Sequence, residues 1–249
     1  MSGHSRWSTI KRKKGASDAA RGKVFTKVAR EIMVSAKIGG GDPDGNPRLR
    51  AALLAARAAN MPKENQERAI KKGLGELEGV NYEEVVYEGR GPAGSAFVLE
   101  VLTDNRNRTA PELRHILGKA GGEMGGLGSS TWMFDHKAVF VLAKARIDEA
   151  ALMERALEAG ADDVRDEDEV WVVSGEPSSY SELEAALADL EPESGDVQRV
   201  VKPEHALALS GDAAISVAKL WARLDELDDV QKVYCSAELP DDIMEEHGP

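Results

Sequence analysis

The chain has 249 residues, of which 42% are hydrophobic and 31% are charged, a composition typical of a folded soluble protein. The sequence has no apolar run near the roughly 20 residues that a membrane span requires, and no apolar signal-peptide core follows the basic N-terminus. The single cysteine, Cys235, excludes an internal disulfide and a cysteine-based metal cage. We therefore expect a cytoplasmic protein without a metal or cofactor, in which Cys235 is a buried structural thiol.

The net charge of −12 is unevenly distributed along the chain. Residues 1–80 contain 17 Lys and Arg against 8 Asp and Glu, whereas the other 169 residues contain 15 against 36. A basic end on an acidic protein favours a polyanionic partner at that end, and the acidic remainder limits unspecific binding. The charge pattern thus indicates a nucleic-acid-binding module more than a small-molecule enzyme.

The first 15 residues combine Ser, Gly and basic residues with one Trp and show no helical or strand period, so we expect an arm that is flexible when free. A helix over residues 17–38 should follow, since Ser17 or Asp18 can cap its start and three glycines follow its end. Its apolar side chains share one side of a helical wheel. The opposite side, which we expect to face solvent, carries Lys23, Lys27, Arg30 and Lys37.

Two shorter helices complete a predicted three-helix domain over residues 1–80. The stretch GGGDPDGNP reads as a turn, after which Asn46 can cap a helix over residues 47–59 with Pro47 at its first position. A highly charged helix is expected over residues 62–72, where Gly73 ends it. The core of this domain is thin, so we expect it to depend on a neighbour or a ligand for order.

From Tyr82 the period changes to that of strands. Strands are expected over residues 85–88 and 96–102, and Thr109 can cap a helix over residues 110–119. The stretch GGEMGGLGSS over residues 121–130 is expected to be a loop. Its backbone N–H groups could wrap an anion, although its glycine content favours a flexible connection.

The rest of the chain predicts sheets covered by helices. Residues 136–202 follow a β-α-β-β-α-β order, with strands over 138–142, 163–166, 170–174 and 197–202 and helices over 147–159 and 181–188. A strand over 206–209, a helix over 212–224 and a strand over 230–237 come after it. We expect an α+β fold: an N-terminal three-helix domain, then two α/β, ferredoxin-like domains, the third inserted in the second. The predicted boundaries are 1–80, 81–135 plus 203–240, 136–202, and an acidic, frayed tail over 241–249.

Catalytic patterns are weak in this sequence. The five histidines show no metal-ligand spacing, and no GxSxG, Walker or CxxC motif is present. His115 is more simply a surface residue, GRGPAG a hairpin turn, and the acidic run over residues 165–169 a solvated turn rather than a metal site. We expect no catalytic residues, no metal and no small-molecule substrate.

Cations and an aromatic side chain in the first 80 residues predict contact with nucleic acid. Lys and Arg meet phosphates, and an aromatic ring beside them can stack on a base. A four-residue basic run alone would suggest a solubilising tail, but this run is part of a larger set. The predicted contacts are Trp7, Lys11, Arg12, Lys13, Lys14, Lys23, Lys27, Arg30, Lys37, Arg48, Arg50, Lys63, Arg68, Lys71 and Lys72, with Arg57 in the same region.

A second polar patch lies where a strand leads into a helix. Its planar donors at a helix N-terminus suit an anionic or amide-rich partner, although capping by Asp104 or Thr109 explains part of the pattern. The predicted secondary surface consists of Asn105, Arg106, Asn107 and Arg108.

Several of these segments closely resemble the YebC/PmpR family. They are GHSRWSTIKRKKG (3–15), GKVFTK (22–27), GGGDPDGNPRLR (39–50), NMPKENQERAIKKG (60–73), YEGRGPAG (87–94) and LTDNRNRT (102–109). The resemblance implies three domains around an open cleft and a cytoplasmic protein that acts on gene expression without catalysis. One departure is Glu123, which stands where the family commonly has an amide in GGNLG, and it argues against a phosphate site in that loop.

The resemblance implies a DNA-binding transcriptional regulator. The alternative is a ribosome-associated translation factor that binds rRNA or tRNA and relieves stalling at proline-rich stretches, since a flexible basic arm with one Trp also suits irregular RNA. A hydrolase that uses the cleft between the α/β domains is a third hypothesis, and the missing catalytic constellation argues against it. The sequence leaves the oligomeric state open.

Overall fold

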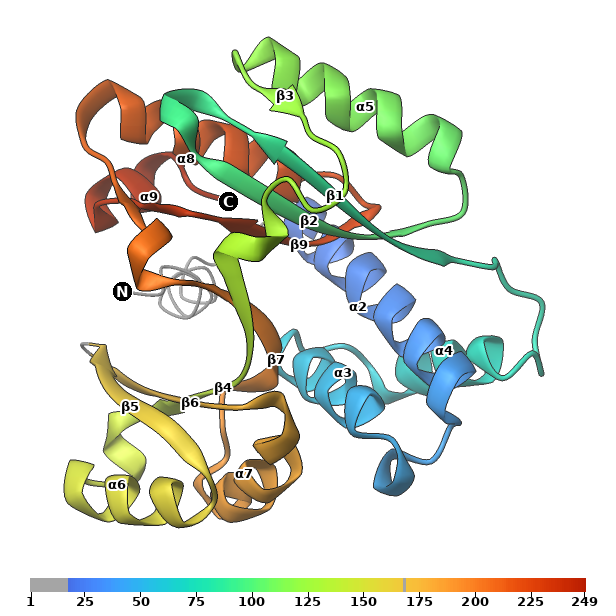
Figure 1. Ribbon diagram of the computed structural model, residues 1–249. Helices are drawn as coiled ribbons and strands as arrows, with labels where there is room; N and C mark the ends of the chain where they lie inside the picture. Colours follow the sequence, from blue (N-terminus) through green and yellow to red (C-terminus); the bar gives the residue numbers. More distant parts are fainter. Residues whose placement is uncertain (1–17, 168) are drawn as a thin grey trace. The chain divides into compact units, whose positions relative to one another are not determined.

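A computed structural model describes residues 18–167 and 169–249 (Figure 1). By compactness the described residues fall into two units. The first unit comprises residues 18–31, 79–135 and 200–249, and the second comprises residues 32–78 and 136–199. These units are not the three predicted domains, whose boundaries stay a prediction.

Helices form the N-terminal part, at the predicted places. They are α2 (Asp18–Gly39), α3 (Pro47–Ala58) and α4 (Lys63–Gly73). Asn46 caps α3 as expected, since its side chain accepts a hydrogen bond from Leu49 N at 3.1 Å. The same buried side chain donates to Ser35 O at 2.9 Å and Gly40 O at 2.8 Å, so it also fastens the end of α2 to the start of α3.

In the second unit, α2 and α4 approach each other closely at Gly73. A Cβ added there would lie 2.3 Å from Met33 O and 3.0 Å from the Cβ of Ala36. Glycine is therefore needed for this contact, because it lets the α4 backbone meet α2 without a side chain between them. The small core of these helices contains Ile32, Ala36, Leu49, Ala52, Ala56 and Ala69.

The first unit contains a sheet in the order β3-β1-β2-β9. Its strands are β1 (Glu83–Arg90), β2 (Ala96–Thr103), β3 (Glu123–Met124) and β9 (Val230–Cys235), and β2 is antiparallel to β1 and β9. Side chains alternate along β2, so Phe97 and Leu99 point to one face and Ala96 and Val98 to the other.

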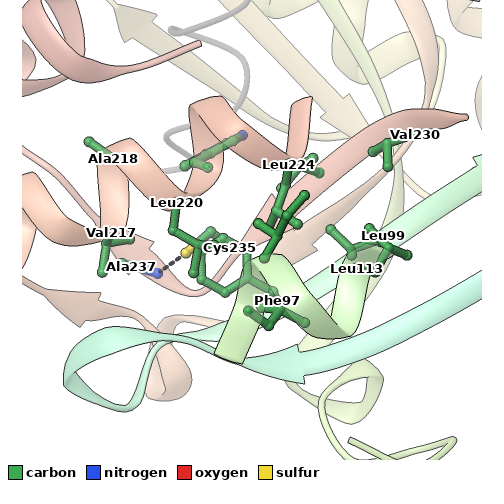
Figure 2. Packing of buried hydrophobic residues seen from close by; sticks show 14 of the residues in the cluster. Phe97, Leu99, Leu113, Val217, Ala218, Leu220, Leu224, Val230, Cys235 and Ala237 are labelled. Atoms are coloured by element: carbon green, nitrogen blue, oxygen red, sulfur yellow. Dashed lines mark hydrogen bonds between the residues drawn. The ribbon is translucent and has the colours of Figure 1, made fainter. Parts of the chain in front are cut away.

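Two helices, α5 (Arg106–Lys119) and α8 (Gly211–Asp225), cover the Phe97 face of this sheet. Figure 2 shows Leu113 of α5 and Val217, Leu220 and Leu224 of α8 in one cluster with Cys235. The Cys235 sulfur accepts a hydrogen bond from Ala237 N at 3.4 Å. Burial raises the pKa of the Cys235 thiol to about 12, so it stays protonated at neutral pH. The prediction of a buried structural cysteine is thus confirmed.

Residues 134–201 form the predicted β-α-β-β-α-β arrangement. The elements are β4 (Phe134–Ala143), α6 (Glu149–Glu158), β5 (Ala161–Glu167), β6 (Val170–Gly175), α7 (Tyr180–Leu187) and β7 (Ser194–Val201). The strand order is β5-β6-β4-β7, the ferredoxin-like order. Side chains of α6 and α7 pack on one face of this sheet, around Phe140, Leu152, Trp171 and Leu183.

Three local predictions were wrong. Helix α5 begins at Arg106, and Asn105 rather than Thr109 caps it by accepting from Arg108 N at 3.2 Å. The glycine-rich stretch contains β3, so it is not wholly a flexible loop. The acidic tail is not frayed, because α9 (Asp241–His247) buries Met244 in the core beside α8, and a short parallel pair, β8 (Leu207–Ala208) and β10 (Ala237–Glu238), precedes it.

Candidate nucleic-acid interface

The most basic part of the chain is its beginning. Residues 1–31 contain nine Lys and Arg against two Asp and Glu, whereas residues 32–78 contain eight against six. Five of the predicted contacts lie outside the described residues: Trp7, Lys11, Arg12, Lys13 and Lys14. The structure describes the other predicted contacts, on α2, α3, α4 and the start of α5.

Two cations of α2 do not face solvent, which corrects the predicted basic stripe. Lys27 Nζ lies 3.3 Å from the carboxylate of Asp225, and Arg30 Nη1 lies 2.7 Å from the carboxylate of Asp229. Arg30 also donates to Asp228 O at 2.6 Å. The helical wheel predicted exposure because it does not show the acidic partners, which lie at and just after the C-terminal end of α8, almost 200 residues further along the chain. Lys23 and Lys37 are exposed as expected.

Asp229 accepts hydrogen bonds from several elements of the first unit. One carboxylate oxygen accepts from Arg30 of α2. The other accepts from Arg108 Nη2 at 2.8 Å, Thr109 Oγ1 at 2.6 Å and Thr103 Oγ1 at 3.1 Å. Only 7% of Asp229 is exposed, so the carboxylate binds α2 to the end of β2 and to the first turn of α5.

The donors around Asp229 keep it ionised. Burial acts to raise the pKa of Asp229, but the hydrogen bonds from Arg108, Thr109 and Arg30 outweigh burial and hold that pKa below its ordinary value. The same contact, together with Asp104 at 2.7 Å, raises the pKa of Arg108. A buried charge that is fully hydrogen-bonded in this way positions the surrounding elements.

The predicted secondary surface is therefore divided between structure and solvent. Asn105 caps α5, Arg106 pairs with Glu83 at 2.6 Å, and Arg108 bridges Asp104 and Asp229. Asn107 is exposed on the first turn of α5. Much of the polarity of the TDNRNRT motif thus serves the fold.

In the second unit, Arg50 also has protein partners. Its Nε and Nη2 donate to one carboxylate oxygen of Glu184 at 2.8 and 2.6 Å, and its Nη1 donates to Pro43 O at 2.8 Å. The hydrogen bond with Glu184 raises the pKa of Arg50. Arg50 is thus half-buried and fixed by these hydrogen bonds. Arg48, two residues earlier on α3, is also half-buried.

Helix α4 carries the most exposed group of predicted contacts. Arg68 meets Glu64 at 2.8 Å and Lys63 meets Glu67 at 3.9 Å, one turn apart along the helix. Exposed ion pairs of this kind contribute only about 0.3–0.5 kcal/mol to stability. A phosphate can therefore take the place of the Glu partner of Lys63 or Arg68 at little cost in free energy. Lys71 and Lys72 lie exposed in the last turn of α4, as does Arg57 in the last turn of α3.

The glycine-rich loop binds an anion, but one that the chain itself supplies. Glu88 of β1 is 2% exposed, and its carboxylate accepts from Gly128 N and Ser130 N at 2.6 Å and from Thr131 N at 2.8 Å. Burial acts to raise the pKa of Glu88, and these backbone bonds lower it below its ordinary value. Glu88 therefore occupies these three N–H groups, which supports the expectation that the loop is not a phosphate site.

Asp229 and Glu88 were missed by reasoning from the sequence. A weak indication of Asp229 exists, because the acidic run LDELDD over residues 224–229 follows a helix and could complement a basic stripe. For Glu88 the indication is a carboxylate within a strand beside a glycine-rich stretch. Neither pattern identifies the residues that donate hydrogen bonds to Asp229 or to Glu88.

Within residues 18–167 and 169–249, no group of three or more His, Cys, Asp or Glu side chains is arranged to hold a metal ion. In the same part of the chain, no helix is both long and apolar enough to cross a bilayer.

The structure thus defines an α+β protein in which a helical part that exposes cations precedes sheet-containing parts. Family models match most of the chain: the TACO1/YebC N-terminal domain matches residues 5–76, and the TACO1/YebC second and third domain matches residues 82–237. The chain belongs to the TACO1/YebC family.

Relatives of similar length support this assignment. A protein of Desulfatibacillum aliphaticivorans is 53% identical over 248 residues, which are 99% of this chain and 100% of that protein. A protein of Geobacter sulfurreducens is 53% identical over 98% of this chain and 99% of its own length. Both carry the name "Probable transcriptional regulatory protein".

A solved structure agrees with the fold. The crystal structure of a conserved hypothetical protein from Aquifex aeolicus is 42% identical in sequence and has a TM-score of 0.83. The match covers 93% of this chain and 96% of that chain. The predicted α+β class, with helices before sheet domains, is confirmed.

Proposed function

We propose that the protein is a non-enzymatic regulator of transcription that binds DNA through its basic N-terminal segment. The observation that carries the proposal is the charge of residues 1–31, nine cations against two acids in a protein with a net charge of −12. Such a segment attracts the phosphate backbone, while the acidic remainder repels it and limits unspecific contact. The names of the relatives support a regulatory role.

The described structure refines which cations would meet phosphates. Lys27, Arg30 and Arg50 are held by carboxylates of the chain, so the proposal assigns them to structure. The remaining contacts would come from the N-terminal run together with the exposed cations of the helices. These are Lys11, Arg12, Lys13, Lys14, Lys23, Lys37, Arg57, Lys63, Arg68, Lys71 and Lys72.

A charge-reversal series tests the proposal. Changing Lys11, Arg12, Lys13 and Lys14 together to Glu is expected to abolish the electrophoretic shift of promoter DNA fragments from the regulated genes, because repulsion replaces phosphate contact. As a matched pair, Lys14→Glu should weaken binding, whereas Lys219→Glu, which changes an exposed cation of α8, should leave it unchanged. The thermal unfolding midpoint should be the same in all variants.

Two results would contradict this function. One is a DNA affinity that the fourfold change leaves at the wild-type value at low salt. The other is wild-type protein that fails to shift DNA against competitor but sediments with ribosomal particles at low salt and leaves them at high salt, which would favour a translation factor.

A further inference from the structure

Helix α6 of the second unit carries an apolar stripe that its own sheet does not cover. Leu157 is 53% exposed, Ala150 is exposed and Met153 is half-buried. At about 100° per residue, these three side chains lie within about 60° of one another around the helix. Leu152 and Ala156 lie on a different side of α6, where they are buried in the core of the β4–β7 sheet. We define Ala150, Met153 and Leu157 as the α6 seam.

The α6 seam has the spacing of a contact between two helices. Its members are three and four residues apart, as are the a, d and a positions of a heptad repeat, whose apolar side chains interlock with those of a partner helix. In the same register, Glu149 occupies a g position and Glu154 an e position, and both are exposed. Side chains at e and g positions meet the charges of a partner helix and set partner choice. Helix α6 thus presents an apolar line with a charged border.

The charge around the α6 seam is strongly negative. The two cations at this helix already have acidic partners: Arg146 lies 2.6 Å from Glu191, and Arg155 Nη1 donates to Asp189 at 3.2 Å. With these pairs included, two cations stand against six acids, the other four of which are Asp148, Glu149, Glu154 and Glu158. The sign is the same over all of residues 136–199, which contain 6 Lys and Arg against 17 Asp and Glu.

This charge decides which kind of partner fits the α6 seam. Phosphates would be repelled by the acidic border, so a nucleic acid does not fit. A second copy of α6 would bring like charges together across the contact, which is unfavourable. Lys or Arg at the e and g positions of another helix would instead pair with Glu149 and Glu154. The complementary partner is therefore basic.

We propose that the α6 seam binds a basic amphipathic helix of another protein. Apolar side chains of that helix pack on Ala150, Met153 and Leu157, and its Lys or Arg side chains pair with Glu149 and Glu154. At 1.5 Å per residue the seam is about 10 Å long, so it contacts about two turns of the partner. A contact of this size is typical of a transient complex. This interaction goes beyond the proposed DNA binding and does not depend on it.

The probe is a fluorescein-labelled peptide of three heptads with Leu at a and d and Lys at e and g, whose like charges limit its self-association. Fluorescence anisotropy should show saturable binding to the full-length protein. Leu157→Ser should weaken this binding about tenfold, because it removes the most exposed apolar side chain of the seam. Ile38→Ser, which removes a 65% exposed apolar side chain from α2, is the matched control and should leave the affinity unchanged. A peptide with Ser at a and d keeps every charge and should bind about tenfold more weakly than the Leu peptide.

A charge swap tests the border of the seam. Changing Glu149 and Glu154 together to Lys should reverse the preference, so that the variant binds a peptide with Glu at e and g more tightly than the Lys peptide. Glu182→Lys changes an exposed acid of α7 and should keep the wild-type preference for the Lys peptide.

Three results would overturn the proposal. The first is wild-type protein that does not bind the Leu peptide, or binds it no more tightly than Leu157→Ser does. The second is equal affinity of wild type for the Leu and Ser peptides, since charge alone would then explain binding. The third is a wild-type dimer in sedimentation velocity that Leu157→Ser abolishes, which would assign the seam to a second copy. The proposed function is judged separately, by the shift of promoter DNA.

Discussion

At the residue scale, Asp229 is the clearest case of a charge that the fold depends on. Asp229 is only 7% exposed. Its carboxylate accepts hydrogen bonds from the side chains of Arg30, Arg108, Thr103 and Thr109. Removing one member of a buried ionic network leaves the others without compensation, at a cost of about 3 kcal/mol. The exposed cations elsewhere on the helices involve no comparable cost.

Asp229→Asn should therefore lower the free energy of unfolding at pH 7 by about 3 kcal/mol. The folded-state pKa of Asp229 is lowered, so its contribution is present above the ordinary carboxyl pKa of about 4 and is lost as the pH falls through the folded-state value. The difference between variant and wild type should consequently shrink in urea unfolding at pH 3 compared with pH 7.

Asp189→Asn is the control for this experiment. Asp189 also has a lowered pKa, caused by its hydrogen bond with Arg155, but its side chain is exposed. Surface pairs are screened by water, so this change should have little effect. If Asp229→Asn lowers the free energy of unfolding at pH 7 no more than Asp189→Asn does, Asp229 does not stabilise the fold in the way that its buried contacts indicate.

Side-chain roles could be predicted from the sequence where the interaction is local. Asn46 was identified as a cap because its partner, Leu49, is three residues away. Arg30 and Arg108 were assigned to solvent because their shared partner, Asp229, lies 199 and 121 residues away. Periodicity states which side of a helix is polar, but it does not state whether water or another element meets that side.

At the scale of elements, helices with strong end signals were predicted well and short segments were not. The predicted ends of α3 and α4 lie within one residue of the observed ends, since Pro47 and Gly73 mark them. The seven residues of α9 are too few to show a clear period, and Met244 orders them by packing against α8. In the glycine-rich stretch, order comes from Glu88, a partner that composition does not reveal.

The contact between α2 and α4 can be tested with a pair of glycine substitutions. Gly73→Ala should destabilise the helical part by about 1–3 kcal/mol, because the new Cβ would lie 2.3 Å from Met33 O and force the helices apart. Gly22→Ala on α2 meets no atom within 4 Å and should stabilise by about 0.5–1 kcal/mol, as expected when Ala replaces Gly within a helix.

Native-state hydrogen exchange is the suitable measurement for this pair. Faster exchange in α2 and α4 is expected for Gly73→Ala, with slower or equal exchange for Gly22→Ala. Equal protection of α4 in Gly73→Ala and wild type would show that the helices do not need the close approach.

At the scale of the whole molecule, the α+β class followed from the order of strand-like and helix-like periods, and the β4–β7 part follows its predicted ferredoxin-like order. The charge asymmetry between the two ends of the chain also followed from the sequence. The sequence did not show which cations of residues 1–80 are exposed and which pair with carboxylates of the chain. Once Lys27, Arg30 and Arg50 are assigned to carboxylates, the basic character depends still more on the first 23 residues. We therefore expect this segment to carry most of the electrostatic attraction to DNA.

The salt dependence of DNA affinity tests that requirement most directly. Each phosphate contact contributes about −0.9 to the slope of log K against log salt, so about six contacts predict a slope near −5 for the wild type. The variant with Glu at positions 11–14 should lose about four contacts, so its weak residual binding at low salt should show a slope near −2. A wild-type slope near zero, or equal slopes in the two proteins, would contradict the claim that the N-terminal cations hold the nucleic acid.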